Sequence, residues 1–336
     1  MQQKHSTKRT KQKKPKTINT LPIYVFLLIC LILYIYFEAN KILSIVFGAF
    51  LFFAIIILLV IETINGIREE GYLKNIIEVA IAIIVVVIFW FSLKALLHTN
   101  YPLDVVPSCS MLPSLKRGDL VVLQGIRNIS RIKAPMVSVT SNEYQNMISN
   151  ISKEALSCVA YNISNGRVQI SQFLKPGYSI GLYSSSAFGG GIVPQDAQDN
   201  NLIKYTCGTA NLLLQNGSIQ EEAYTTSITI SGTVVTGDKN NSIVVYQTIP
   251  QDIFYKQGDS YIVHRVYAII NVSGSYYILT KGDNNPGLDI QFNNYPANLS
   301  LVQGKVIVSI PYLGYLKLIL SSNFNQPYGC NFVTLN

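Results

Sequence analysis

The 336-residue chain is short of charged side chains: only 13% of its residues are Asp, Glu, Lys or Arg, whereas 49% are hydrophobic. Soluble domains carry about twice this proportion of charge, roughly a quarter of their residues. Intrinsically disordered chains combine low hydrophobicity with high charge, so the composition excludes that class. It also argues against an ordinary cytosolic enzyme. Together with a mean hydropathy of +0.29, it favours a membrane protein.

Histidine is scarce as well, since the chain contains only His5, His98 and His264. This count excludes the zinc sites that use two closely spaced or three histidines. No Cys-x-x-Cys or Cys-x-x-His spacing is present to hold a structural zinc ion. We therefore expect no zinc site. If the region beyond the last apolar segment uses an imidazole base, that base must be His264.

Acidic residues are absent from the first 17 positions, which hold seven of the 26 basic side chains. In the rest of the chain the basic side chains outnumber the acidic ones by only one, so the net charge of +8 comes almost entirely from this basic tail. Because the chain has no basic domain, we expect no nucleic-acid partner. A basic tail ahead of apolar segments instead predicts a cytoplasmic N-terminus under the positive-inside rule.

Three long apolar segments follow the tail, at Leu21–Phe37, Ile42–Ile61 and Val79–Leu97. Their one charged side chain is Lys94, whose stem can extend toward the membrane surface. A helix needs about 20 apolar residues to cross the bilayer core, and each segment is close to that length, so we predict three transmembrane helices. No small-x-small cleavage pattern follows the first segment, and we expect it to be retained.

Three crossings from a cytoplasmic N-terminus place everything after about His98 on the extracytoplasmic side. The glycosylation sequons agree with this topology, because all seven lie beyond the third segment. They are Asn128, Asn150, Asn162, Asn216, Asn240, Asn271 and Asn298. We therefore predict a multi-pass protein of the cell membrane, in contact with membrane lipid, whose larger part faces outward.

Beyond Tyr101 the sequence is rich in Ser, Asn, Gly and Tyr, and short β-branched runs alternate with turn residues, which predicts an all-β domain. Ser141–Leu156 is the one stretch with a helical pattern. Ile310–Leu320 is apolar but too short to span a membrane, and we expect an element at the outer leaflet or in the core. The predicted strands are Leu120–Leu123, Arg167–Ile170, Ser227–Val235, Ile243–Tyr246, Tyr261–Ile270, Tyr276–Thr280 and Lys305–Ile310.

The five cysteines fit an oxidising exterior. Cys158 and Cys207 both lie in the outward-facing region, and we expect them to form a disulfide. Cys30 falls inside the first apolar segment, and Cys109 lies in a serine-containing motif. Cys330 is then expected to be unpaired near the C-terminus.

Three motifs together contain a hydroxyl, an imidazole and two carboxylates. The first is Pro107–Pro113 (PSCSMLP) followed by Gly-Asp, the second is Ile262–Val266 (IVHRV), and the third is Thr280–Asn285 (TKGDNN) followed by Asp289. A serine hydroxyl becomes an effective nucleophile when an adjacent base takes its proton, and a neutral imidazole can do this near pH 7. A carboxylate on the other ring nitrogen fixes the tautomer and stabilises the imidazolium.

In this order, Ser-x-Ser-Met-x-Pro with Gly-Asp, Val-His-Arg-Val and Lys-Gly-Asp-Asn-Asn-x3-Asp resemble the motifs of type I signal peptidases. They are most similar to the archaeal and endoplasmic-reticulum branch, which uses serine and histidine where the bacterial branch uses serine and lysine. Gly304–Val306 and Ile310–Tyr315 are also similar to this branch. The resemblance implies a membrane-bound serine endopeptidase that removes signal peptides from secretory preproteins at small-x-small sites, with the protein translocon as a further partner.

Carried over by position, the resemblance implies that Ser110 is the nucleophile and His264 the general base. Asp289 matches the carboxylate usually assigned to the triad, and Asp283 matches a supporting acid, although the sequence does not separate the two. The Ser108 hydroxyl and the Ser110 N–H are the implied donors of the oxyanion hole. Neither a metal nor a cofactor is implied.

The separation of Ser110 and His264 along the chain is far longer than this branch normally shows. A second Gly-Asp, at Gly237-Asp238, precedes a run similar to the strand before the family's histidine, so residues 126–232 are interpreted as an inserted β-rich domain. The expected organisation is a basic tail at 1–20, three transmembrane helices within 21–97, a signal-peptidase-like catalytic β domain at 98–125 and 233–320, and a C-terminal tail at 321–336.

Two other functions remain open at this point. One is a non-enzymatic, membrane-anchored and glycosylated surface β domain for adhesion or attachment, with the insertion as its binding part. The other is a related membrane protease with different substrates. The first predicts no effect of substituting Ser110, His264 or Asp289, whereas cleavage assays on signal-peptide and other substrates separate the second.

Overall fold

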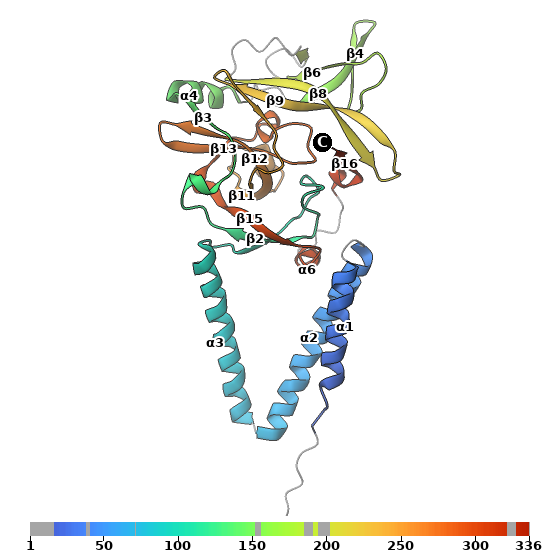
Figure 1. Cartoon of the computed structure of the whole chain (residues 1–336), viewed down its shortest axis with the longest axis vertical. Helices are drawn as coiled ribbons and strands as arrows, with labels where there is room; N and C mark the ends of the chain where they lie inside the picture. The colour runs from blue at the N-terminus through green and yellow to red at the C-terminus, as the bar shows by residue number, and fades with distance from the viewer. Residues whose placement is uncertain are drawn as a thin grey trace, which may run out of the picture. The chain divides into compact units, whose positions relative to one another are not determined.

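The computed structural model describes residues 17–37, 41–70, 72–151, 156–184, 191–193, 202–320 and 327–335. Most of the predicted basic tail, residues 1–16, lies outside the described residues. The chain divides into two compact units, Met1–Ser92 and Leu93–Asn336. The first is built from helices and the second largely from β-strands, as Figure 1 shows.

The helices are α1 (Leu21–Tyr36), α2 (Lys41–Glu70) and α3 (Tyr72–Leu97). Two segments are long and apolar enough to cross a membrane, Val46–Arg68 within α2 and the whole of α3, and α1 contains a shorter apolar stretch. Both helices extend beyond the apolar runs that predicted them, because a helix continues through flanking polar residues as long as its backbone hydrogen bonds are made.

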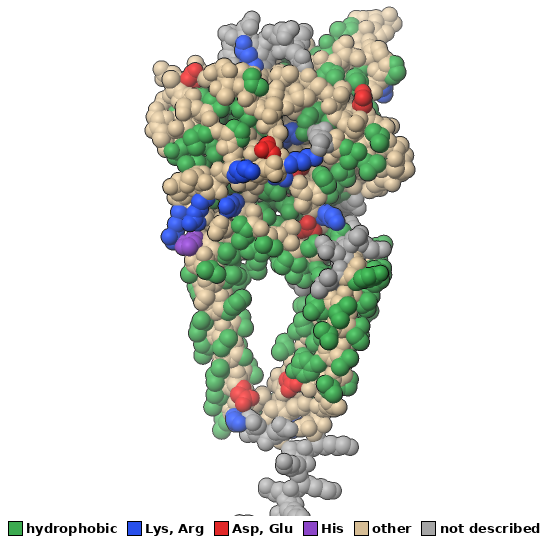
Figure 2. Space-filling model, in the orientation of Figure 1, with side chains coloured by type: hydrophobic (Ala, Val, Ile, Leu, Met, Phe, Trp, Pro, Cys, Tyr) green, Lys and Arg blue, Asp and Glu red, His purple; other side chains and the backbone are tan. Residues whose placement is uncertain are grey.

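Most of the described hydrophobic side chains on α2 and α3 are exposed, and hydrophobic side chains cover much of the visible surface of these helices (Figure 2). Phe53 is 60% exposed and Val86 65% exposed, and the apolar core of α3 buries none of its residues. A soluble core helix buries such side chains, and large exposed apolar patches mark membrane or protein contacts. The two helices therefore indicate that the chain associates with a membrane.

The β-rich unit is centred on an eight-stranded sheet in the order β1-β2-β15-β11-β12-β13-β14, to which β3 adds in parallel beside β12. The other pairings in this sheet are antiparallel. Its strands are β1 (Leu103–Val105), β2 (Leu120–Gln124), β3 (Met136–Val139), β11 (Ile243–Gln247), β12 (Tyr261–Val272), β13 (Ser275–Lys281), β14 (Ala297–Asn298) and β15 (Val302–Ile310).

Two four-stranded sheets complete the unit, in the orders β5-β4-β6-β7 and β10-β9-β8-β16. Figure 1 shows the long β8 and β9 above the strands of the central sheet, with β16 beside β8. Their strands are β4 (Cys158–Ser164), β5 (Arg167–Ser171), β6 (Ser179–Tyr183), β7 (Ile192–Val193), β8 (Ile203–Leu214), β9 (Ile219–Ile230), β10 (Thr233–Thr236) and β16 (Phe332–Leu335).

The described residues of 126–232 share a core with the central sheet. Buried side chains from the two smaller sheets, among them Leu182 and Ile228, share one hydrophobic cluster with Ile270 of β12 and Leu279 of β13. The strand β3 also belongs to this part of the chain, yet it pairs with β12. Burying these apolar side chains together makes the insertion an integral layer over the central sheet.

Several predicted elements differ in detail. Ser227–Val235 is not one strand but the end of β9, a turn and β10, because Ser231 and Gly232 adopt positive φ values of 46° and 80°. Ser141–Leu156 contains a helix whose N-terminus is capped by a Thr140–Glu143 capping box. Part of the rest of that stretch lies outside the described residues. The remaining helices are α4 (Ser141–Ser149), α5 (Ile253–Lys256), α6 (Tyr315–Leu320), η1 (Ile129–Arg131), η3 (Asp289–Phe292), η4 (Leu299–Leu301) and η5 (Tyr328–Asn331).

Two disulfides hold the β-rich unit. Cys158–Cys207 forms as predicted. The prediction that Cys330 is unpaired is wrong, because it forms a disulfide with Cys109. A pairing between such distant positions leaves no local signal in the sequence; it arises because β16 pairs with β8 and brings the end of the chain to the serine motif.

Candidate active site

Ser110 lies in the loop between β1 and β2, and burial of its neighbours fixes this loop. Cys109 is 6% exposed on one side of it, and Met111 on the other is fully buried against Val121, Val263 and other apolar side chains. Ser110 itself is half-buried. The alternation of buried and accessible side chains turns the hydroxyl away from the core.

His264 lies in the first third of β12, opposite Val244 of β11, and is only 3% exposed. Its Nε2 lies 2.9 Å from the Ser110 Oγ, and its Nδ1 lies 2.7 Å from the Asp289 Oδ2. An ionised carboxylate can only accept a hydrogen bond, so Nδ1 carries the proton of the neutral ring. Nε2 is then free to accept the hydroxyl proton of Ser110. The three residues that the motifs predicted for the triad therefore meet in space.

Asp289 begins the short helix η3 and is 3% exposed. A buried carboxylate is stable only when hydrogen bonds replace the water it loses. Besides His264, the Oδ2 of Asp289 accepts from the Thr280 hydroxyl at 2.6 Å and from the Tyr246 hydroxyl at 3.0 Å. Burial, together with the nearby Asp289 charge, raises the pKa of Tyr246 well above its usual value, so this phenol stays protonated and donates.

Asp283 has a different partner. Its carboxylate forms a bidentate ion pair with Arg265, with Nε 2.8 Å from Oδ1 and Nη2 2.7 Å from Oδ2. The same guanidinium donates to the Ser114 hydroxyl at 3.0 Å and to the Asn241 carbonyl at 2.7 Å. Of the two aspartates that the sequence left unseparated, the structure brings Asp289 to the histidine, whereas Asp283 fixes loops around the site.

The predicted oxyanion donors are close to the nucleophile. The hydroxyls of Ser108 and Ser110 lie 3.1 Å apart. Within the described part of the chain, no acceptor takes a hydrogen bond from the backbone N–H of Ser110. Both groups are therefore available beside the hydroxyl, where a carbonyl under attack develops negative charge.

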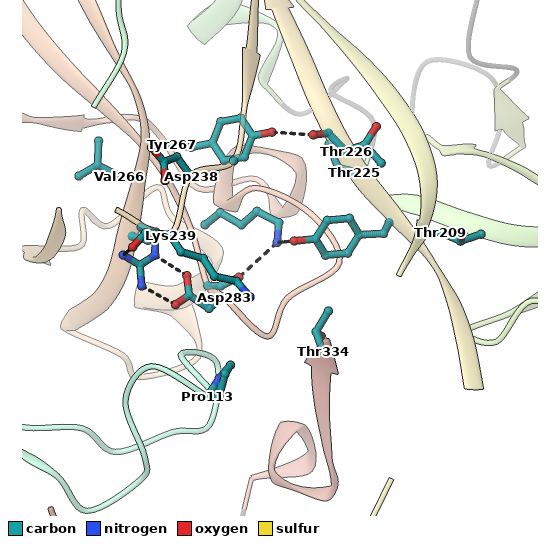
Figure 3. A pocket seen from close by; sticks show the side chains of 15 residues that line it. Pro113, Thr209, Thr225, Thr226, Asp238, Lys239, Val266, Tyr267, Asp283 and Thr334 are labelled. Carbon is teal, nitrogen blue, oxygen red and sulfur yellow. Dashed lines mark hydrogen bonds and ion pairs between the residues drawn. The ribbon is translucent and has the colours of Figure 1, made fainter. Parts of the chain in front are cut away.

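A pocket of about 260 Å³ lies beside the serine loop and is lined by Pro113, Arg265 and Asp283, among others. Figure 3 shows Asp283 in the pocket wall, with dashed lines to the guanidinium group of Arg265. The triad residues do not line it. Lys281 does, and its Nζ donates to the Tyr224 hydroxyl and to the Asn285 carbonyl, both at 2.6 Å. Burial lowers the pKa of Lys281 to about 8, although neighbouring carboxylates oppose the shift. The Lys281 amine is therefore held by hydrogen bonds to Tyr224 and Asn285 and makes no hydrogen bond to the described triad residues.

Residue-by-residue interpretation of the sequence missed Tyr246, Thr280 and Arg265 as supporting groups. Thr280 is the first residue of the TKGDNN motif and Arg265 follows the histidine directly, so both lay within the recognised motifs. Tyr246 lies on β11, two residues after Val244, which pairs with His264. Only the pairing of β11 with β12 places this tyrosine near the triad. Among the described residues, no group of three or more His, Cys, Asp or Glu could hold a metal ion.

Comparison with protein-family models, with curated protein sequences and with solved structures finds no match to this chain. The interpretation of the site therefore depends on the geometry of its own residues and on the motifs that contain them.

Proposed function

We propose that the chain is a membrane-bound serine endopeptidase of the signal-peptidase type, with Ser110 as nucleophile, His264 as general base and Asp289 as the third member of the triad. One observation carries the proposal: a continuous hydrogen-bonded line from the Ser110 Oγ through the imidazole to the Asp289 carboxylate, with distances of 2.9 and 2.7 Å. The order and content of the three motifs support the same assignment.

The reaction begins when the Ser110 Oγ attacks the scissile carbonyl and His264 Nε2 takes the hydroxyl proton. Asp289 stabilises the imidazolium through Nδ1–H. The Ser108 hydroxyl and the Ser110 N–H donate to the oxyanion, which is often the largest single contribution to catalysis. The imidazolium then gives its proton to the leaving amine, and an acyl-enzyme remains. His264 deprotonates a water that attacks the ester, and release of the acid restores the Ser110 hydroxyl.

The proposed substrates are secretory preproteins delivered by the translocon and cut after a small-x-small sequence. In this proposal α1 is the first of three spans, the N-terminus is cytoplasmic and the β-rich unit acts outside. The basic tail and the length of the apolar segments support this orientation. Small side chains enter shallow pockets, whereas large ones are excluded by overlap, which accounts for a preference of this kind.

The proposal is tested with purified full-length protein in detergent and a preprotein that carries an Ala-x-Ala site. Ser110→Ala and His264→Ala are each expected to lower cleavage by about 10⁴-fold or more, since a triad acts as a unit. Ser149→Ala, which removes an exposed hydroxyl at the end of α4, is the matched control and should cleave at the wild-type rate. Mass spectrometry of the product identifies the bond that is cut.

Wild-type cleavage by Ser110→Ala would overturn the proposal and favour the surface-domain alternative. Cleavage of unrelated unfolded proteins at the same rate as the preprotein would instead leave a serine protease with a different substrate class. A preprotein with large residues at both small positions serves as the substrate control.

A further inference from the structure

The C-terminal segment, residues 327–335, lies against the serine loop although the two are far apart in the sequence. Its strand β16 pairs with β8, with Phe332 opposite Leu214, so one part of the segment is fixed to the layer over the central sheet. Its Cys330 forms the disulfide with Cys109, the residue directly before Ser110, and their Cα atoms lie 5.0 Å apart. The segment therefore has a covalent link to the loop that carries the hydroxyl.

Asn284 provides a second link between the same two parts of the chain. It is 3% exposed, and its Nδ2 donates to the carbonyls of Gly329 at 2.9 Å and Phe332 at 3.1 Å. Its Oδ1 accepts from the backbone N–H of Thr334 at 2.7 Å and from the Thr334 hydroxyl at 3.1 Å. The amide is satisfied almost entirely by the C-terminal segment.

The same asparagine also holds the backbone of the serine loop. Its Nδ2 lies 3.2 Å from the Cys109 carbonyl, and its backbone N–H donates to the Ser110 carbonyl at 2.8 Å. Gly282 approaches so closely that a Cβ there would lie 2.7 Å from the Ser110 carbonyl oxygen. The two peptide groups next to the nucleophile are thus fixed by contacts that the C-terminal segment completes.

We propose that the C-terminal segment is a positioning element for the reaction: through the Cys109–Cys330 disulfide and Asn284 it holds the backbone of residues 109–110 so that the Ser110 hydroxyl stays in line with His264. This inference rests on the proposed function for its catalytic consequence. A displacement of about 1 Å in a reacting group can cost on the order of 100-fold in rate. Burial of Met111 still anchors the loop from its other side, so loss of the disulfide weakens the reaction without abolishing it.

Two variants separate positioning from general stability. Cys330→Ala opens the disulfide at the serine loop without changing a triad or oxyanion residue. The matched control, Cys158→Ala/Cys207→Ala, removes the other disulfide, which lies within the insertion. We expect Cys330→Ala to lower kcat by about tenfold or more while KM changes by less than about threefold. The control should keep kcat within about twofold of the wild type. The double variant Cys109→Ala/Cys330→Ala leaves no unpaired thiol at the loop. It should behave like Cys330→Ala, because the loss comes from opening the disulfide and not from the free thiol of Cys109.

Amide hydrogen exchange of the same full-length proteins measures the local opening of the serine loop and needs no substrate. Residues 106–116 should exchange faster in Cys330→Ala and at the wild-type rate in the control. Wild-type kcat together with wild-type exchange in Cys330→Ala would overturn the inference. So would an equal loss of kcat in both variants, which indicates a merely structural role.

If the wild type cleaves no preprotein, the proposed function fails, and the exchange rates alone decide whether the C-terminal segment holds the loop. If Cys330→Ala does not fold, Thr334→Val takes its place. This nearly isosteric change removes the hydroxyl donor to Asn284, together with its longer 3.4 Å contact to the Glu222 carboxylate, and should lower kcat about two- to fivefold with KM unchanged. An unchanged kcat in a folded Thr334→Val protein would then count against the inference.

Discussion

The segment that follows β13 has carboxylates on two sides of the candidate site, and the two sides are built in different ways. On the triad side, Asp289 is buried and accepts hydrogen bonds from His264, Thr280 and Tyr246 on one oxygen. On the pocket side, Asp283 is held in a bidentate pair by Arg265. The first arrangement directs a charge at an imidazole, whereas the second holds loops together. Residue type alone does not assign a role; the partner of each carboxylate does.

The largest effect that tests this difference is expected from paired Asp→Asn substitutions. Asp289→Asn leaves the shape of the side chain intact but removes the charge that fixes the tautomer of His264, and it should lower kcat by about 10⁴-fold. Asp283→Asn should lower kcat by no more than about tenfold. Steady-state cleavage of a preprotein measures both. Equal losses would contradict the separation of the two sides.

A smaller effect is expected from the hydroxyls that hold the triad carboxylate. Tyr246→Phe and Thr280→Val each remove one donor to the Asp289 Oδ2 without a large change of volume. Each should lower kcat about tenfold and destabilise the fold by about 1–3 kcal/mol, since a buried carboxylate loses a hydrogen bond. Thermal unfolding and cleavage are measured together on each variant. Tyr276→Phe, which changes a half-buried tyrosine of β13 outside this network, is the control.

The pocket side should respond in stability more than in rate. Asp283→Asn leaves Arg265, which is about one-tenth exposed, without its counter-charge. Removing one partner of a buried ion pair typically costs about 3–5 kcal/mol. We therefore expect a lower denaturation midpoint for Asp283→Asn than for Asp289→Asn, the reverse of their order in kcat. A midpoint equal to that of the wild type would show that the pair does not hold the loops.

The contrast also explains what the sequence predicted and what it did not. Ser110, His264 and Asp289 were predicted because each lies in a short motif that resembles one of the motifs of type I signal peptidases. The apolar helices and most strands of the central sheet were predicted for a similar reason, since periodicity and composition are local signals. The choice between Asp283 and Asp289 was not local, because it depends on which residue the turn after β13 delivers to the histidine.

The errors concern contacts between distant segments. The pairing of Cys330 with Cys109 depends on β16 adding to β8, and so short a strand at the end of the chain has no pattern strong enough to predict its partner. The insertion was bounded by the long separation of Ser110 and His264 and by the second Gly-Asp, and neither signal shows that its apolar side chains bury against β12 and β13. Both features follow from strand pairing and core packing between segments that are far apart in the chain, which no single window of sequence contains.

The smallest effect on rate is expected from Glu222, on the pocket side, where the response should be to pH. Glu222 is 1% exposed, and burial raises its pKa to about 7, although the nearby Lys281 charge opposes the shift. A carboxyl whose pKa is higher in the folded than in the unfolded chain binds its proton more tightly when folded. Folding is therefore favoured below about pH 4.5 and loses stability as pH rises toward 7, by on the order of 3 kcal/mol in total.

Glu222→Gln removes this ionisation but keeps the shape of the side chain, so its unfolding free energy should lack the wild-type decline between about pH 4.5 and 7. Denaturant titrations at several pH values in that window measure the difference, and kcat at pH 8 should stay within about twofold of the wild type. Glu221→Gln, one position earlier on β9, has an exposed side chain and is the matched control. Parallel pH curves for the wild type and Glu222→Gln would mean that Glu222 does not titrate in this window. A large loss of kcat would instead place Glu222 in the triad's chemistry and break the distinction between the two sides.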